Sequence, residues 1–278
     1  MSGTLYLVAT PIGNLEDMTY RAVRVLREAD LIACEDTRTS RPLLSHFDIH
    51  TPTTSYHEFN KIDKAEELLD KLISGQNIAV ITDAGTPGIS DPGEELCARC
   101  IEAGVPVVPV PGAAAAIAAV TSSGLSCRRF AFEAFLPKDK KKRRRILEEL
   151  KKETRTITIY EAPHHLRDTL DELYEALGDR RISLARELTK VHEEHLLMTL
   201  SQAITHYGDN DPRGEYVLVI EGRSIEELEA ETRAGWEEMS IEDHMDIYLK
   251  QGMDKKEAMK AVAKDRGVSK RDIYQMLL

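Results

Sequence analysis

The stretch TDAGTPGISDPGEEL, residues 82–96, directly follows the apolar run NIAVI at residues 77–81. An apolar run that ends in glycines and prolines and precedes an amphipathic segment is typical of a buried strand, a loop and a helix. Similar strand-like runs are LYLVAT (5–10), LIACED (31–36), TTSYHE (53–58) and VPVVPV (105–110). Segments with apolar residues at helical spacing lie at residues 18–29, 61–74 and 91–103. Strands that alternate with helices predict a parallel sheet covered on both faces.

A second group of strand-like runs follows the alanine-rich residues 113–119. Its members are FAFEAF (130–135), TITIYEA (156–162), RISLARE (181–187), HLLMTL (195–200) and EYVLVIEG (215–222), with a helix expected at residues 163–177. After Gly222 an acidic stretch precedes two or three short helices, which Gly252 and Gly267 are expected to end. We therefore expect an N-terminal α/β domain at residues 1–115, a C-terminal α/β domain at 116–223, and an acidic linker with a helical appendage at 224–278.

The composition limits the classes of protein to which the chain can belong. A chain of 278 residues with 42% hydrophobic and 31% charged residues can form two compact domains with real cores. Its apolar runs are far shorter than the roughly 20 residues needed to span a bilayer, so we expect a cytoplasmic protein that has no membrane contact. Cys97 and Cys100 are the only close pair among four cysteines. Because no second such pair accompanies them, we expect two helix positions and no metal site.

The charge is unevenly distributed. A formal net charge of −11 argues against a protein that coats nucleic acid non-specifically. Yet KDKKKRRR, residues 138–145, is densely basic, and residues 255–271 are also rich in Lys and Arg. We expect the first block on a loop before a helix at 146–152, where it either forms a solvated face or binds a polyanion. The candidate polyanion-binding residues are Lys138, Lys140, Lys141, Lys142, Arg143, Arg144 and Arg145.

The loop at residues 82–96 matches neither common nucleotide motif. A P-loop requires GxxxxGK[ST], and a dinucleotide fingerprint requires GxGxxG after the first strand, where this chain has ATPIGNL. The loop suits polar, uncharged groups and an adenosine ribose better than a triphosphate. The favoured interpretation of Asp91 is a cap on a helix that begins at Pro92. In the second such element, VPVVPVPGAAAAIAAV (105–120), small residues after Pro111 and Gly112 allow close packing of either a ligand or the sheet.

Several motifs together carry a resemblance. They are LYLVATPIGNLEDMTYRAVRVLREADLIACEDTR, SYHEFN, VITDAGTPGISDPGEEL, VPVPGAAA, IYEAPHHL, ARELTKVHEE and GEYVLVIEG. In this order, from about residue 4 to residue 222, the chain resembles the bacterial small-subunit ribosomal RNA cytidine 2′-O-methyltransferases of the tetrapyrrole-methylase fold group. The C-terminal residues are similar to the helix-turn-helix-like appendage of that family.

The resemblance implies a fold, a cofactor and a substrate. It implies two α/β domains of the tetrapyrrole-methylase type with S-adenosylmethionine in the cleft between them, 16S ribosomal RNA or the small ribosomal subunit as partner, and a homodimer. Carried over by position, the implied cofactor-binding residues are Pro11, Asp83, Ala84, Gly85, Pro87, Ile89, Ser90, Gly112, Ala113, Tyr160, Glu161, Ala185 and Arg186. The nucleotide would face CEDTR and YHEFN in the first domain and ELTK with HEE in the second.

Methyl transfer needs alignment of the ribose hydroxyl with the methyl group, and a positioned base or cation would help. The candidate catalytic residues are Glu187, Lys190, Asp36, Arg38 and His57. Structural alternatives stay open for three of them. Glu187 could pair with Arg186 or Lys190, His57 could be a core histidine, and Arg38 could only contact phosphate.

Two other functions stay open at this point. A tetrapyrrole methyltransferase would share the fold, but it would leave the basic block and ELTK without a purpose. A non-enzymatic nucleic-acid-binding regulator would depend on the C-terminal helices. Deletion of residues 224–278 discriminates between them, because a methyltransferase should still bind its cofactor.

Overall fold

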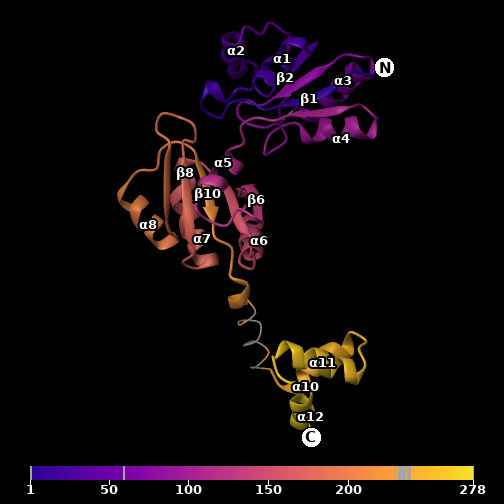
Figure 1. Ribbon diagram of the computed structural model, residues 1–278, viewed down its shortest axis with the longest axis vertical. Coiled ribbons are helices and arrows are strands. Elements are labelled where there is room, and N and C mark those ends of the chain that lie inside the picture. Colours follow the sequence, from indigo (N-terminus) through magenta and orange to yellow (C-terminus); the bar gives the residue numbers. More distant parts are fainter. Residues whose placement is uncertain (1, 59, 229, 231–235, 237–238, 278) are drawn as a thin grey trace. The chain divides into compact units, whose positions relative to one another are not determined.

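The computed structural model describes residues 2–58, 60–228, 230, 236 and 239–277 (Figure 1). The chain divides into two compact units, which are described separately. The first runs to Leu150 and continues over Arg155–Glu221, and the second joins Lys151–Thr154 to the residues from Gly222 onward. The three-part division expected from the sequence stays a prediction. Within the described ranges, no helix has the length and apolar character that a membrane crossing requires.

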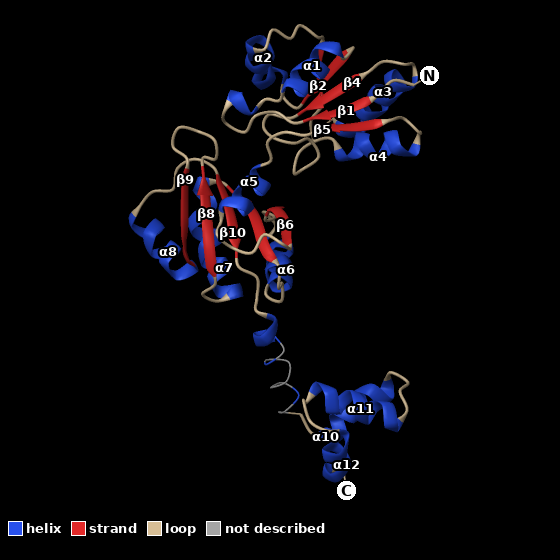
Figure 2. Ribbon diagram, in the orientation of Figure 1, coloured by secondary structure: helices blue, strands red, loops and turns tan. Residues whose placement is uncertain are grey.

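The first unit contains a parallel sheet of five short strands in the order β3-β2-β4-β1-β5 (Figure 2). The strands are β1 (Leu5–Val8), β2 (Leu31–Cys34), β3 (Thr53–Ser55), β4 (Ile78–Ile81) and β5 (Val107–Val110). Helices α1 (Tyr20–Glu28) and α2 (Thr37–His46) contribute to the core on one face, and α3 (Lys61–Ile73) and α4 (Glu94–Glu102) to the core on the other. The predicted parallel sheet with helices on both faces is confirmed.

One local prediction in this part of the fold is wrong, and one helix was missed. Helix α4 begins at Glu94 with Gly93 as its N-cap, and no side chain caps it, so Asp91 is not the expected helix cap. The backbone explains this, because φ is +66° at Ser90 and +142° at Gly93, outside the right-handed helical region. Helix α2 was not expected at all. Its N-cap is Asp36, whose side chain accepts a hydrogen bond from the backbone N–H of Arg38 at 2.8 Å.

The first unit also contains a mixed sheet in the order β6-β7-β10-β8-β9. Its strands are β6 (Phe130–Phe135), β7 (Thr156–Glu161), β8 (Arg181–Arg186), β9 (Glu194–Thr199) and β10 (Tyr216–Ile220), of which only β6 and β7 pair in parallel. One face packs against α6 (Lys140–Leu150), α7 (Leu166–Leu177) and α8 (Leu200–Asp209), and the other against α5 (Ala115–Ser122). Every predicted strand of this group forms, whereas α8 was not anticipated.

The basic block lies on a helix and not on a loop, which corrects the prediction. Helix α6 starts at Lys140, where the Asp139 side chain accepts a hydrogen bond from the backbone N–H of Lys142 at 2.8 Å. Lysine and arginine have high helix propensity. Leu147 and Leu150 are buried in the core of the second sheet and hold the helix in place. Repulsion between the charges is therefore outweighed by propensity, capping and packing.

Three of the described helices of the second unit pack around a small core of their own. They are α10 (Ile241–Lys250), α11 (Lys255–Asp265) and α12 (Lys270–Met276), packed on Met245, Ala258, Met259, Val262, Ala263 and Ile273. Capping boxes begin α11 and α12. The predicted stops are confirmed, since Gly252 and Gly267 follow helix ends with φ of +90° and +67°. Of the expected acidic linker, residues 229, 231–235 and 237–238 lie outside the described residues.

Candidate functional site

A cavity of about 250 Å³ in the first unit is the candidate site. Its wall comes from both sheets, mainly from residues that follow the ends of β4, β7 and β8 and from the start of the antiparallel β10. The lining residues are Ile12, Ala84, Gly85, Thr86, Ile89, Ser90, Asp91, Ala114, Ala115, Phe135, Tyr160, Glu161, Ala162, Ala185, Glu187, Leu188, Lys190, Glu215, Tyr216 and Val217. Ligands in α/β folds bind outside the carboxyl ends of strands, so the position suits a ligand site.

The structure brings together about half of the expected cofactor-binding residues. Ala84, Gly85, Ile89, Ser90, Tyr160, Glu161 and Ala185 line the cavity. Pro11, Asp83, Pro87, Gly112, Ala113 and Arg186 do not line it. A direct neighbour in the chain lines the cavity for all of these except Gly112, which lies two residues before Ala114.

Backbone pairing fixes the glycine-rich loop that follows β4. Thr10 and Gly85 exchange two hydrogen bonds, of 2.8 and 3.2 Å, in an isolated antiparallel bridge. The hydroxyl of Thr86 donates to the carbonyl oxygen of Ala113 at 3.0 Å, which joins the loop to the start of α5. Gly85 has a φ of +85°, a conformation that glycine adopts without steric cost. The loops after β1, β4 and β5 are thus tied to one another at the cavity.

Asp91 is a half-buried carboxyl group in an acidic part of the cavity wall. Burial, and to a smaller extent the charges of Glu35 and Asp83, raise its pKa to about 7. The N–H of Asp83 donates to Glu35 at 3.2 Å, so the two acids that end β2 and β4 lie side by side. Sequence reasoning missed this role for Asp91. The available signal was the pair of acids directly after two apolar runs, which parallel strands bring to the same edge.

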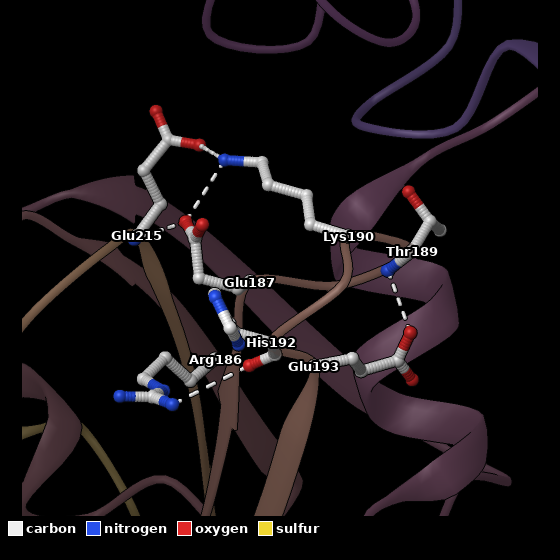
Figure 3. A network of polar contacts seen from close by, with 7 residues as sticks. All are labelled: Arg186, Glu187, Thr189, Lys190, His192, Glu193 and Glu215. Atoms are coloured by element: carbon white, nitrogen blue, oxygen red, sulfur yellow. Dashed lines mark hydrogen bonds and ion pairs between the residues drawn. The ribbon is translucent and has the colours of Figure 1, made fainter.

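The loop after β8 carries a network centred on Lys190 (Figure 3). The ammonium group of Lys190 lies 2.8 Å from Glu187 Oε1 and 2.9 Å from Glu215 Oε2. The hydrogen bond from Lys190 lowers the pKa of Glu187, which the backbone N–H of Glu215 also contacts at 2.9 Å. Glu187 is therefore ionised at neutral pH and is a poor proton acceptor. The ion pair with Lys190 that the sequence left open is confirmed, whereas Glu215 was not anticipated.

Two glycines make room for this network. A Cβ on Gly214 would lie 2.4 Å from Cγ and 2.6 Å from Oε1 of Glu187. A Cβ on Gly13 would lie 2.4 Å from Cγ of Lys190, so the loop after β1 packs directly on the loop after β8. Glu187 itself has a φ of +51°, a sparsely populated conformation that is common at functional sites.

The candidate catalytic residues of the first sheet lie apart from the cavity lining. Arg38 pairs with Asp36 at 2.7 Å, and a hydrogen bond from Arg38 lowers the pKa of Asp36 to about 2. Neither residue lines the cavity, and His57 does not line it either. Of the five candidates, only Glu187 and Lys190 do so. In the YHEFN motif, Phe59 lies outside the described residues.

The basic block of α6 divides into exposed cations and one structural arginine. Arg143 is largely covered; it donates to the Thr169 hydroxyl at 2.7 Å and pairs with Glu172. The Thr169 hydroxyl in turn donates to the Glu161 carboxylate at 2.5 Å, so Arg143 supports a residue of the cavity wall. Arg145 pairs with Glu149 at 2.9 Å. The remaining members, which are exposed, are Lys138, Lys140, Lys141, Lys142 and Arg144.

Comparison with solved structures identifies the fold. Uroporphyrin-III C-methyltransferase from Thermus thermophilus, in complex with S-adenosylhomocysteine, matches with a TM-score of 0.57 at 19% identity, over 79% of this chain and 97% of that one. A diphthine synthase matches with a TM-score of 0.60 at 12% identity, over 79% and 90% of the two chains. At these identities the likeness concerns the fold alone, and it confirms the predicted fold class.

Comparison of sequences gives the family. The model for tetrapyrrole (corrin/porphyrin) methylases matches residues 4–204. A protein of Halalkalibacterium halodurans named ribosomal RNA small subunit methyltransferase I is 51% identical over 99% of this chain and 94% of its own length. Proteins of the same name from Synechocystis and Bacillus subtilis are 48% and 46% identical, over 99% and 98% of this chain and 98% and 93% of their own lengths. The chain therefore belongs to the tetrapyrrole methylase family and, within it, to the ribosomal RNA small subunit methyltransferase I group, as its motifs predicted.

Proposed function

We propose that the protein transfers a methyl group from S-adenosylmethionine to the 2′-hydroxyl of a cytidine in 16S ribosomal RNA. The observation that carries this proposal is the identity of about half of all residues, across nearly the full chain, with relatives named for methylation of small-subunit ribosomal RNA. The cavity is suited to the cofactor. Apolar side chains such as Ile12, Leu188 and Val217 suit an adenosyl group, and the carboxyl groups of Asp91 and Glu161 suit a cation.

The residues of the cavity position the reactants and exclude water. When bound, S-adenosylmethionine supplies a sulfonium-activated methyl group for in-line displacement by the hydroxyl oxygen. Alignment in a water-poor site supplies most of the rate in such a reaction. Although burial alone would lower the pKa of Lys190, its hydrogen bonds to Glu187 and Glu215 raise it. Lys190 therefore stays a cation, which can hold a phosphate or the hydroxyl oxygen but cannot accept a proton.

The exposed cations of α6 are proposed to bind RNA phosphates. Phosphate contacts provide affinity without sequence selection, so the cavity must select the cytidine. The proposal excludes Arg143 from this surface, because its guanidinium is engaged with Thr169 and Glu172.

We also propose that the protein is a homodimer and that it is cytoplasmic. Strand β9 is the outer strand of the second sheet, and no described strand pairs with its free edge. Near this edge Leu197 is 50% exposed and Val191 is 96% exposed. Apolar side chains beside an open strand edge are typical of a surface that another copy covers. The cytoplasmic location follows from the proposed ribosomal substrate.

The reaction itself is tested with tritium-labelled S-adenosylmethionine and two substrates, namely naked 16S RNA and small subunits that lack the modification. We expect label on the ribose of one cytidine in at least one substrate, located by nuclease digestion. Label on neither substrate, with cofactor binding intact in calorimetry, would contradict the proposal and favour a tetrapyrrole substrate.

Neutralising exposed cations of α6 should weaken RNA binding. For Lys141→Gln with Arg144→Gln we expect lower affinity and a salt dependence whose log–log slope is smaller by about 0.7 per lost phosphate contact. Filter binding between low and moderate salt measures both. The matched control is Arg24→Gln with Lys71→Gln, which removes equal charge from residues paired with Glu28 and Glu67. Equal affinity loss in control and variant would refute a specific contact.

Adding a methyl group to Gly214 should disrupt the Lys190 network. In Gly214→Ala the new Cβ displaces the Glu187 carboxylate, and misplacement by about 1 Å can cost roughly 10²-fold in rate. The control is Gly104→Ala, because Gly104 has a similar φ of +70° but a Cβ there would meet nothing within 4 Å. Both variants incur the cost of the left-handed backbone, and only Gly214→Ala also displaces Glu187, so its melting temperature should be the lower. Assayed below both melting temperatures, we expect slow methyl transfer only for Gly214→Ala. Equal rates would show that the position of Glu187 does not matter.

A further inference from the structure

Asp91 lines the cavity without a partner of opposite charge. Among the described residues, no hydrogen bond or ion pair reaches its carboxyl group, whereas Glu161 accepts two hydrogen bonds and Glu187 pairs with Lys190. Lys190 also lines the cavity, but its ammonium is shared between Glu187 and Glu215. The charge of a bound ligand should therefore shift the pKa of Asp91 more than the pKa of the other acids that line the cavity.

The charged groups that act on the pKa of Asp91 are acids. Glu35 follows β2, Asp83 follows β4, and Tyr160 lies on β7, where its own pKa is raised by burial and then by the charge of Asp91. Asp36 lies next to this set, with its N–H donating to Asp83 at 3.3 Å. Without a ligand, burial and these charges place the pKa of Asp91 at about 7. A cation in the cavity would lower it, and a neutral ligand would not.

The proposed substrate and product of this cavity differ by one charge. S-adenosylmethionine carries a sulfonium cation, whereas S-adenosylhomocysteine has a neutral thioether at the same place. We propose that Asp91 responds to this charge: it is a carboxylate beside S-adenosylmethionine and a carboxylic acid beside S-adenosylhomocysteine. The residue thus favours binding of the methyl donor and release of the spent cofactor. This inference rests on the function proposed above.

The proton balance of the reaction fits this role. The carbon–sulfur bond breaks with both electrons left on sulfur, and the methyl carbon bonds to the ribose oxygen. The hydroxyl proton is lost in the same step, and Asp91 takes it up, directly or through water, as the positive charge on sulfur disappears. One proton is released and one is bound, so no further reactant is needed.

Calorimetry in buffers of different ionisation enthalpy measures how many protons are released or bound when the ligand binds. It therefore tests the proposal without an activity assay. At pH 7 we expect S-adenosylmethionine to release about half a proton per site from Asp91, and S-adenosylhomocysteine, which displaces water without adding charge, to release none and instead to take up as much as about half a proton there. In Asp91→Asn this difference should vanish, and the preference for S-adenosylmethionine should fall by about tenfold. Groups of the ligands themselves titrate equally in both proteins and cancel in the comparison.

A second measurement does not depend on the variant. In the wild type, the affinity ratio of S-adenosylmethionine to S-adenosylhomocysteine should rise as pH increases through about 7, because ionised Asp91 attracts the cation. The control is Asp171→Asn, which removes an exposed carboxylate of α7 that does not line the cavity, so proton release should persist. Equal proton release by wild type and Asp91→Asn would overturn the inference. Failure of the wild type to bind either ligand would instead overturn the proposed function.

A different observation concerns the second unit. Lys256, Lys260 and Lys264 occupy successive turns of α11 and are exposed. No described residue forms an ion pair with any of the three, and the same holds for Lys270 and Arg271 on α12. Arg266, by contrast, is turned inward and donates to the carbonyl oxygen of Ser240 at 3.1 Å. Like charges spaced by four residues destabilise a helix unless an anion is nearby.

We infer that the exposed lysines of α11 form a second phosphate-binding surface for the RNA substrate. This inference also rests on the proposed function. A row of unpaired cations in a chain with net charge −11 fits the phosphodiester backbone of RNA. Because the surface belongs to a separate compact unit, it would add affinity without altering the cavity.

Full-length Lys260→Gln with Lys264→Gln should bind 16S RNA several-fold more weakly and with a smaller salt slope. Affinity for S-adenosylmethionine should not change. The control is Arg24→Gln with Lys250→Gln, which removes equal charge from residues that face Glu28 and Asp246. Unchanged RNA affinity in the α11 variant would overturn the inference, whereas a wild type that binds no RNA would contradict the proposed function.

Discussion

The Lys190 ammonium, shared between Glu187 and Glu215, is the interaction on which the shape of the cavity depends. It joins the end of β8 to the start of β10, two strands that pair side by side. The loop can adopt this form only because the backbone at Glu187 and Thr189 has positive φ, and because Gly13 and Gly214 carry no Cβ. Local strain is thus offset by the ion pair and by close packing of the loop after β1.

Two carboxyl groups that line the cavity have pKa values shifted in opposite directions. Hydrogen bonds from Lys190 and the backbone lower the pKa of Glu187, whereas burial and neighbouring acids raise that of Asp91 to about 7. Carboxyl groups whose environments move their pKa values apart can take different roles in one reaction. Of the two, Glu187 can then position the cationic Lys190, and Asp91 can exchange a proton near neutral pH.

The strands were predictable because each is a short apolar run bounded by turn residues. Such a pattern depends only on residues that are close together in the sequence. Helix α2 was missed because its sequence, TRTSRPLLSH, is largely polar and contains Pro42. The basic block of α6 was assigned to a loop because like charges repel one another. Burial of Leu147 and Leu150 nevertheless stabilises the helix. Asp91 was assigned to a cap because the positive φ of Ser90 and Gly93 is invisible in the sequence. Its neighbour Glu35 comes from a strand far away in the chain.

The distribution of charge reconciles an acidic protein with an RNA substrate. Many cations are already neutralised within the fold, as Arg143 is by Glu172 and Lys190 is by two glutamates, and these contribute little to an outer field. The cations that are not neutralised can attract a polyanion. They include the exposed cations of α6 and the unpaired lysines of α11. The excess of acids repels RNA from the rest of the surface, so net charge argues against loose binding but not against binding at a few chosen places. At the cavity, acidic groups attract a ligand where elsewhere they repel RNA, because unpaired Asp91 and its acidic neighbours favour a cationic cofactor.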